Sequence, residues 1–339
     1  MHMLAISKDW VAITSDTETF VVPGLPDGFE VTKAQLRGTP NDPDSDWSKF
    51  WDQMREAEVE AFGTVANSFE ELEPEYIKEY MKATGKKVWC VGPVSLCNKN
   101  DSDKAERGNR TSIGEECLKW LDLQEPGSVV YVCLGSLSRL ATSQLIELGL
   151  ALEASNRPFI WVLRSASEEL QTWILEEKFE ERITDRGFLI RGWAPQVLIL
   201  SHLSIGVFLT HCGWNSTLEG ITAGVPMITW PFFADQFFNE KFIVNVIKTG
   251  IRVGVEEPVF FGHEENAGVQ VKSDEIKRVI EKLMDGEEEG NERRKRAKEL
   301  GEMAKRAVEE GGSSYLNMTL FIEDVMAKQP NSGGPEQEK

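Results

Sequence analysis

The second half of the chain repeats one pattern, in which a short, continuous apolar run precedes a segment whose apolar residues have helical spacing. The apolar runs, each long enough for one strand, cover 128–136, 158–164, 188–193, 205–210 and 225–230. The segments with helical character cover 142–155, 216–224 and 235–250. Continuous apolar runs are typical of strands that are buried on both faces of a parallel sheet. The alternation therefore predicts an α/β domain with a parallel sheet and right-handed crossovers.

The N-terminal third is less regular. Its apolar pattern predicts short strands at 20–22, 63–68 and 86–94, and helices at 47–62 and 69–85. Residues 97–114 are polar without an apolar period, which is typical of a linker. The resulting division is a first domain at 1–96, a linker at 97–114, a second domain at 115–326 and a disordered tail at 327–339.

Composition and charge exclude several classes of partner and setting. The 339 residues carry a net charge of −19, which argues against a nucleic-acid partner because phosphate backbones require a basic surface. No apolar run approaches the length needed to span a bilayer. The five cysteines are scattered without a CxxC pair, so we expect a reduced, cytoplasmic setting and a monomeric protein.

The stretch from 208 to 236 carries the richest candidate chemistry. The run 205–210 brings the chain to the carboxyl edge of the predicted sheet, where ligands of open α/β sheets bind. There Gly213 allows a turn, and Asn215 and Ser216 are of helix-capping types. Free N–H groups at a helix start form an anion site suited to phosphate. A capped helix after a strand is also common, so this loop alone leaves phosphate binding and simple capping open.

Neighbouring stretches favour a ligand. Trp193 follows another strand and offers a surface on which a base could stack. Glu219 lies one turn into the short helix and could accept hydrogen bonds from a ribose diol. Asp235 and Gln236 follow the next strand and suit sugar hydroxyls. These residues, together with the loop at Gly213, would bind a base, a ribose, a phosphate and a sugar, which indicates a nucleotide-sugar site.

The run from Trp193 to Gln236, "WAPQ…HCGWNSTLEG…GVPM…WP…ADQ", resembles the signature box of plant UDP-dependent glycosyltransferases, which glycosylate small secondary metabolites and hormones. Other stretches also look like that family, at 20–27, 67–76, 89–94, 127–136 and 157–164. The resemblance implies two Rossmann-like α/β domains facing a cleft, the GT-B arrangement. Only about 100 residues precede the linker, roughly half of such a domain, so we expect the N-terminal domain to be incomplete and the chain truncated.

The resemblance also implies a role for each part of the box. Uridine would be bound by Trp193 through uracil stacking, by the Ala194 backbone and by Gln196, with Glu219 on the ribose hydroxyls. The diphosphate would be bound at the turn of Gly213 by Ser136, His211, Asn215 and Ser216. The sugar would be held by Trp214, Asp235 and Gln236, and a final glutamine usually goes with UDP-glucose. No metal and no further cofactor are implied.

The catalytic base is missing from its family context. In this family a histidine near the N-terminus deprotonates the acceptor hydroxyl, and inverting attack requires that base within hydrogen-bond reach. None of the four histidines, His2, His202, His211 and His263, stands in that context, so the catalytic residue stays unassigned.

Two hypotheses therefore remain. The first is an inverting glucosyltransferase that uses UDP-glucose and a small lipophilic acceptor of flavonoid, triterpenoid or hormone type. The second is a catalytically impaired fragment that binds the UDP-sugar alone. A nicotinamide dehydrogenase is disfavoured because no GxGxxG follows any strand.

Overall fold

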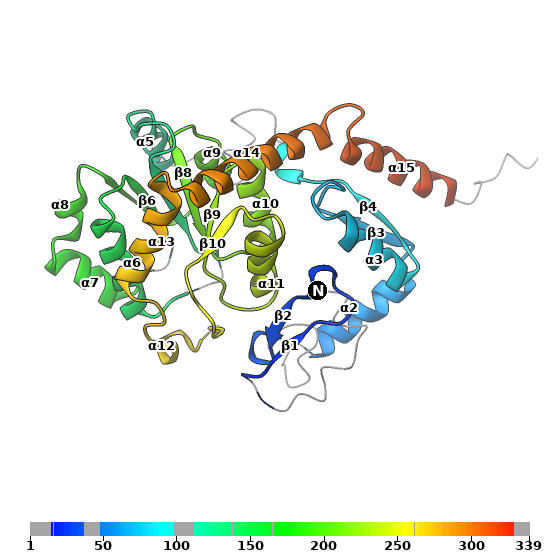
Figure 1. The fold of residues 1–339 in the computed structure, drawn as a ribbon, viewed down its shortest axis with the longest axis horizontal. Helices are drawn as coiled ribbons and strands as arrows, with labels where there is room; N and C mark the ends of the chain where they lie inside the picture. Colours follow the sequence, from blue (N-terminus) through cyan, green and yellow to red (C-terminus); the bar gives the residue numbers. More distant parts are fainter. Residues whose placement is uncertain are drawn as a thin grey trace, which may run out of the picture.

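The structure, a computed structural model, describes residues 15, 17–36, 48–97, 112–136, 139–164, 166–260 and 262–328. The strands in these ranges form one six-stranded sheet and two small two-stranded sheets. The large sheet and its helices make up one side of the molecule, and the small sheets make up the other (Figure 1). The predicted α/β class, with a parallel sheet in the second domain, is confirmed.

The large sheet is parallel throughout, with the order β10-β9-β8-β5-β6-β7. Its strands are β5 (Val129–Cys133), β6 (Phe159–Leu163), β7 (Gly187–Arg191), β8 (Ile205–Thr210), β9 (Met227–Thr229) and β10 (Gly250–Arg252). The first five correspond to the five predicted apolar runs. The strand order reverses between β5 and β8, and such a switch point is where open α/β sheets bind ligands.

Alternate residues of each central strand face two separate hydrophobic clusters. In β5, Val129 and Tyr131 belong to one cluster, and Val130 and Val132 belong to the other. One face is covered by α5 (Ser112–Leu121), α9 (Gln196–Leu200), α10 (Trp214–Ala223), α11 (Gln236–Lys241) and α14 (Glu288–Val308). The opposite face is covered by α6 (Thr142–Ala154), α7 (Glu168–Glu176), α8 (Phe179–Ile183) and α13 (Ser273–Met284). A short helix, α12 (Glu264–Ala267), lies between β10 and α13 along the chain.

The N-terminal part holds two separate strand pairs. β1 (Thr19–Val21) pairs antiparallel with β2 (Glu30–Thr32), and β3 (Gly63–Ala66) pairs parallel with β4 (Lys87–Cys90). Its α-helices are α2 (Ser48–Glu60) and α3 (Pro74–Thr84). The helix predicted at 69–85 begins only at Pro74, because proline fits the first turn of a helix and no position further inside it. That helix ends, as predicted, at Gly85, which has a left-handed φ of 66°.

The last helix, α15 (Ser313–Lys328), crosses to the N-terminal part. Lys87 Nζ of β4 contacts Asp324 Oδ1 at 2.7 Å, and the Trp89 and Phe321 ring centroids are 5.3 Å apart. The predicted division places this helix at the end of the second domain, and the structure adds that it contacts β4 of the first part. Of the predicted linker, 98–111 lies outside the described residues, as do Trp47 and 329–339. Within the described ranges, no helix is long and apolar enough to cross a membrane.

Candidate functional site

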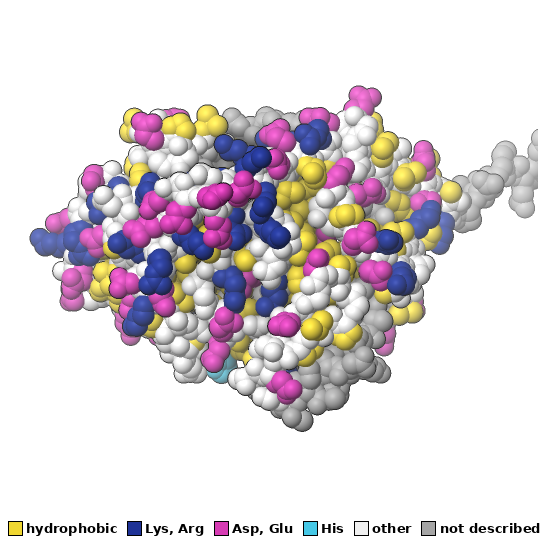
Figure 2. Space-filling view, in the orientation of Figure 1, with side chains coloured by type: hydrophobic (Ala, Val, Ile, Leu, Met, Phe, Trp, Pro, Cys, Tyr) yellow, Lys and Arg dark blue, Asp and Glu magenta, His cyan; other side chains and the backbone are white. Residues whose placement is uncertain are grey.

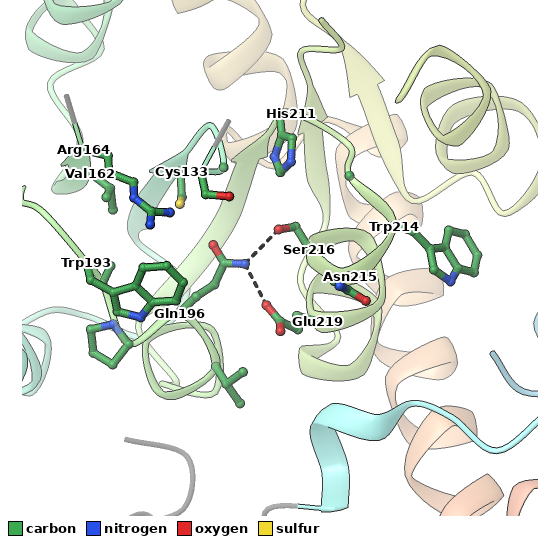
Figure 3. A pocket seen from close by; sticks show the side chains of 16 residues that line it. Cys133, Val162, Arg164, Trp193, Gln196, His211, Trp214, Asn215, Ser216 and Glu219 are labelled. Atoms are coloured by element: carbon green, nitrogen blue, oxygen red, sulfur yellow. Dashed lines mark hydrogen bonds between the residues drawn. The ribbon is translucent and has the colours of Figure 1, made fainter. Parts of the chain in front are cut away.

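A cavity of about 510 Å³ opens at the carboxyl edge of β5, β6, β7 and β8, beside the switch point. All but two of the predicted binding residues line it: Ser136, Trp193, Ala194, Gln196, His211, Gly213, Trp214, Asn215, Ser216 and Glu219. They follow β5, β7 or β8, or lie at the start of α9 or in the first two turns of α10, and Figure 3 labels most of them. Asp235 and Gln236 are not among the lining residues.

His211 follows β8 and packs closely between two glycines. A Cβ atom at Gly135 would lie 2.6 Å from the ring Nε2 of His211, and one at Gly213 would lie 2.4 Å from it. Glycine at both positions therefore makes room for the ring. Burial lowers the pKa of His211 to about 4, so the imidazole is neutral at pH 7. Its buried Nδ1 has no hydrogen-bond partner within the described ranges.

The N-terminus of α10 faces the same cavity. The helix begins at Trp214 with Gly213 as N-cap, and no side chain in the described part of the chain caps it. The sequence had indicated Asn215 and Ser216 as caps, but both lie inside the helix and bind neighbours instead. Asn215 Oδ1 accepts from Asn67 Nδ2 at 3.2 Å, and Ser216 Oγ accepts from Gln196. Among the described residues, no side chain accepts from the first N–H groups of α10, as a phosphate-binding helix start requires.

Gln196 fixes the acidic end of the cavity. Its Nε2 donates to Ser216 Oγ at 3.0 Å and to Glu219 Oε2 at 2.7 Å (Figure 3). Its Oε1 accepts from the hydroxyl of Tyr131 at 3.4 Å. These contacts set the orientation of the amide and hold the Glu219 carboxylate at the rim of the pocket. A carboxylate fixed in this way can accept hydrogen bonds from a vicinal diol.

The sequence pattern missed Arg164, which reaches the aromatic platform. Its guanidinium carbon lies 4.4 Å from the ring centroid of Trp193, whose side chain is 48% exposed. Cys133 and Val162 also line the cavity from β5 and β6. All three lie at or just before the carboxyl end of a predicted strand. The strand-end rule that singled out the loop after β8 could therefore have found them.

The three residues assigned to the sugar have polar atoms that are already hydrogen-bonded to other parts of the protein. Trp214 Nε1 donates to the Asn67 carbonyl at 2.8 Å, and its indole points away from the other labelled side chains (Figure 3). Gln236 Oε1 accepts from the backbone N–H of Phe232 at 2.8 Å. The Asp235 carboxylate accepts from Asn239, and burial raises its pKa. The assignment of Trp214, Asp235 and Gln236 to the sugar stays a prediction.

The remaining histidines lie away from this cavity. His202 Nε2 is 3.1 Å from Asp122 Oδ1, so its ring is held at the opposite end of β8. His263 lies next to α12, and His2 is outside the described residues. In the described part of the chain, His211 is the only histidine that lines the pocket, and no cluster of three metal-ligating side chains occurs.

Comparison with known proteins identifies close relatives of this sequence. The model of a family described as "UDP-glucoronosyl and UDP-glucosyl transferase" matches residues 49–257. UDP-glycosyltransferase 73C4 of Solanum lycopersicum is 61% identical over 322 residues, covering 94% of both chains. UDP-glycosyltransferase 73E1 of Stevia rebaudiana is 59% identical, covering 92% of this chain and 63% of the relative.

Solved structures share the fold. Glycyrrhiza uralensis UGT73P12, complexed with glycyrrhetinic acid 3-O-monoglucuronide, superposes with a TM-score of 0.87 at 40% identity, covering 96% of this chain and 66% of that one. Phytolacca americana UGT2, complexed with UDP-2fluoro-glucose and pterostilbene, gives a TM-score of 0.75 at 34% identity, covering 93% and 66%. The chain spans about two thirds of the length of these two proteins and of the stevia relative.

Proposed function

The chain belongs to the plant UDP-glycosyltransferase family, and from that premise we propose that it binds UDP-glucose for inverting transfer to a hydroxyl of a small lipophilic acceptor. One observation carries this proposal. In a single cavity, the neutral His211 and the uncapped start of α10 lie near the Glu219 carboxylate and the exposed Trp193 ring. The Trp193 ring suits the uracil base, the Glu219 carboxylate suits the ribose diol, and the start of α10 with His211 suits the diphosphate, which is the order of these groups along UDP.

In the proposed mechanism, each of these groups binds a different part of the UDP-glucose donor. Uracil stacks on Trp193, and the ribose hydroxyls donate to Glu219. The diphosphate accepts from the first N–H groups of α10 and from the Ser216 and Ser136 hydroxyls. Donors fixed at this position stabilise the charge that develops on UDP as the sugar leaves. Holding the donor in one pose also aligns its anomeric carbon for attack from the opposite side.

The relatives support the classes of donor and acceptor. Phytolacca americana UGT2 is complexed with UDP-2fluoro-glucose and pterostilbene, and Glycyrrhiza uralensis UGT73P12 with glycyrrhetinic acid 3-O-monoglucuronide. A UDP-sugar and a small organic acceptor are therefore the ligands that we propose here. All five cysteines are free thiols, which supports the proposed reducing, cytoplasmic setting.

A second candidate function is donor binding without efficient transfer. Inverting attack requires a base within hydrogen-bond reach of the acceptor hydroxyl. Of the described histidines, His202 is engaged by Asp122 and His263 lies outside the cavity. His211 lies against the proposed phosphate site, where its role is to bind rather than to deprotonate. This observation favours a chain that holds UDP-glucose and turns it over slowly.

Two measurements test these proposals in sequence. Calorimetry of the full chain with UDP and UDP-glucose should detect binding without added metal, and no binding at millimolar UDP would refute the donor site. An assay of UDP release, with pterostilbene as acceptor and without any acceptor, then separates transfer from binding. Acceptor-dependent release supports the transferase, whereas binding without release supports the second candidate.

A further inference from the structure

Two loops of the second domain contain a non-glycine residue in the left-handed region. Cys212 has a φ of 64° in the phosphate loop (residues 211–213), and Ala234 has a φ of 57° in the sugar loop (residues 234–236). Residues with a Cβ adopt this conformation at a cost in free energy, so it persists only where the surroundings hold it. The two loops follow the neighbouring parallel strands β8 and β9.

One side chain contacts both loops. Asn239 of α11 donates from Nδ2 to the Cys212 carbonyl at 2.8 Å and to Asp235 Oδ2 at 3.0 Å. Its side chain is almost completely buried. Neither Asn239 nor its two partners line the cavity, so within the described residues Asn239 acts on the donor site through the two loops to which Cys212 and Asp235 belong.

We propose that Asn239 is a positioning residue, which fixes the phosphate loop and the sugar loop relative to each other so that one donor molecule can contact both. This inference rests on the proposed function, since it requires UDP-glucose in the cavity. An amide suits the position because one nitrogen carries two hydrogens, one for the carbonyl and one for the carboxylate. UDP without the sugar would contact only the first loop.

The charged groups around Asn239 have their own partners. Glu240, the next residue, accepts from Thr229 Oγ1 at 2.7 Å and from Arg252 Nε at 2.8 Å. Burial raises the pKa of the Cys212 thiol, which is therefore neutral. Asp235 is left with Asn239 as its side-chain donor among the described residues. An aspartate in place of Asn239 would place its carboxylate against the carboxylate of Asp235 and against the carbonyl of Cys212, and neither of these groups can donate a hydrogen bond to it.

The test compares the affinities of UDP and UDP-glucose in the full chain. Calorimetry at pH 7.5 is run on the wild type, Asn239→Asp, Asn239→Ala and Asn239→Ser. Asn239→Ser keeps one hydrogen-bond donor, so it provides a milder variant if the other two fold poorly. The affinity for UDP-glucose should fall about tenfold or more beyond any loss for UDP, since a hydrogen bond to a charged group is removed. Asn239→Asp should show the largest loss and Asn239→Ser the smallest.

Asn317→Asp is a matched control. Asn317 of α15 is equally buried, at 7% exposed against 8% for Asn239, and it also donates to a carboxylate and a carbonyl, those of Glu70 and Ser313. Its replacement should lower thermal stability without changing the ratio of the two affinities. Equal losses for UDP and UDP-glucose in the Asn239 variants, or the same ratio change in Asn317→Asp, would overturn the inference. Failure of the wild type to bind either ligand would instead refute the proposed function.

Discussion

The protonation state of His211 depends on two glycines that pack against its ring. Gly135 and Gly213 let the backbone close around the ring, and the resulting burial lowers its pKa to about 4. The sequence could indicate His211 and Gly213 because both follow a buried strand. It could not indicate that Gly135, 76 positions earlier, would enclose the same ring, because that contact exists only once β5 and β8 are paired.

The lowered pKa of His211 predicts a pH dependence of stability. The unfolded histidine titrates near pH 6.5 and the folded one near pH 4, so the unfolded state binds more protons between these values. The stabilisation is complete above pH 6.5 and is lost as the pH falls toward 4, by about 3 kcal/mol in total. Urea unfolding at pH 5 and pH 7 should show a smaller loss for His211→Asn than for the wild type. Identical losses would show that the ring is not buried as described.

Trp193 provides a prediction of donor affinity. Trp193→Ala should weaken UDP binding by about 1–2 kcal/mol, because it removes the exposed ring on which uracil stacks. Calorimetry measures the difference, and Trp173→Ala is the control. Trp173 packs against Phe179, away from the cavity, so its loss should lower stability while UDP affinity is kept. An unchanged affinity in Trp193→Ala would exclude stacking on this ring.

Gln236 provides a prediction of donor choice. Its Oε1 accepts from the Phe232 N–H, and its Nε2 has no partner among the described residues, so the nitrogen remains for a sugar hydroxyl. Gln236→His should reduce the preference for UDP-glucose over UDP-galactose, because an imidazole presents its donor at a different position. The ratio of the two dissociation constants is the measurement. An unchanged ratio would remove Gln236 from sugar recognition.

Among the elements, the continuous apolar strands were predictable and the irregular ones were not. β5, β6, β8 and β9 correspond to apolar runs because strands buried on both faces hold apolar residues at nearly every position, and the half-buried edge strand β7 was found from its own short apolar run. β10 holds only Gly250, Ile251 and Arg252, too little apolar sequence to be recognised without its partner β9. The helix predicted at 235–250 is divided instead into α11, a π-helical turn at Phe242–Val246 and the start of β10.

The uncapped start of α10 predicts sensitivity to one added methyl group. In Gly213→Ala the new Cβ would lie 2.4 Å from the His211 ring, so the ring or the helix start must move. UDP affinity should fall, and the displacement of the ring or helix start should also lower stability by about 1–3 kcal/mol. Gly114→Ala in α5 is the control, since its Cβ would make an ordinary contact of 3.5 Å with Pro195. Equal UDP affinities for the two variants would show that phosphate does not bind at this helix start.

At the scale of the whole molecule, α15 contacts the N-terminal part along one narrow stripe. Ser314, Asn317, Phe321 and Asp324 face the protein at helical spacing, whereas many apolar side chains of this helix are exposed. Apolar side chains gather on that side of the surface, while acidic and basic groups interleave over the rest (Figure 2). The exposed set comprises Tyr315, Leu316, Met318, Leu320, Ile322, Val325 and Met326. Such a face favours association at high concentration.

The double variant Leu316→Glu with Leu320→Glu should therefore remain monomeric at higher concentration than the wild type. Both side chains are about half exposed, so glutamate meets water and costs little stability. Light scattering measures association, and UDP affinity should not change because neither leucine lines the cavity. Phe321→Glu is the contrasting variant, since it disrupts the contact with Trp89. Association that is unchanged in the double variant would exclude this face as its cause.

Turnover is the property that depends on the molecule as a whole. Of the described histidines, only His211 lines the cavity, and it lies against the proposed phosphate site. Because the described residues place no base in the cavity, we expect transfer by this chain to be about 10²–10⁴-fold slower than by the stevia relative, UDP-glycosyltransferase 73E1. The measurement is UDP release from UDP-glucose with flavonol, triterpenoid and steroid acceptors, both proteins being assayed together. Comparable rates would mean that a base is present, and His2→Asn and His263→Asn would then identify it by the loss of kcat at unchanged affinity for UDP-glucose.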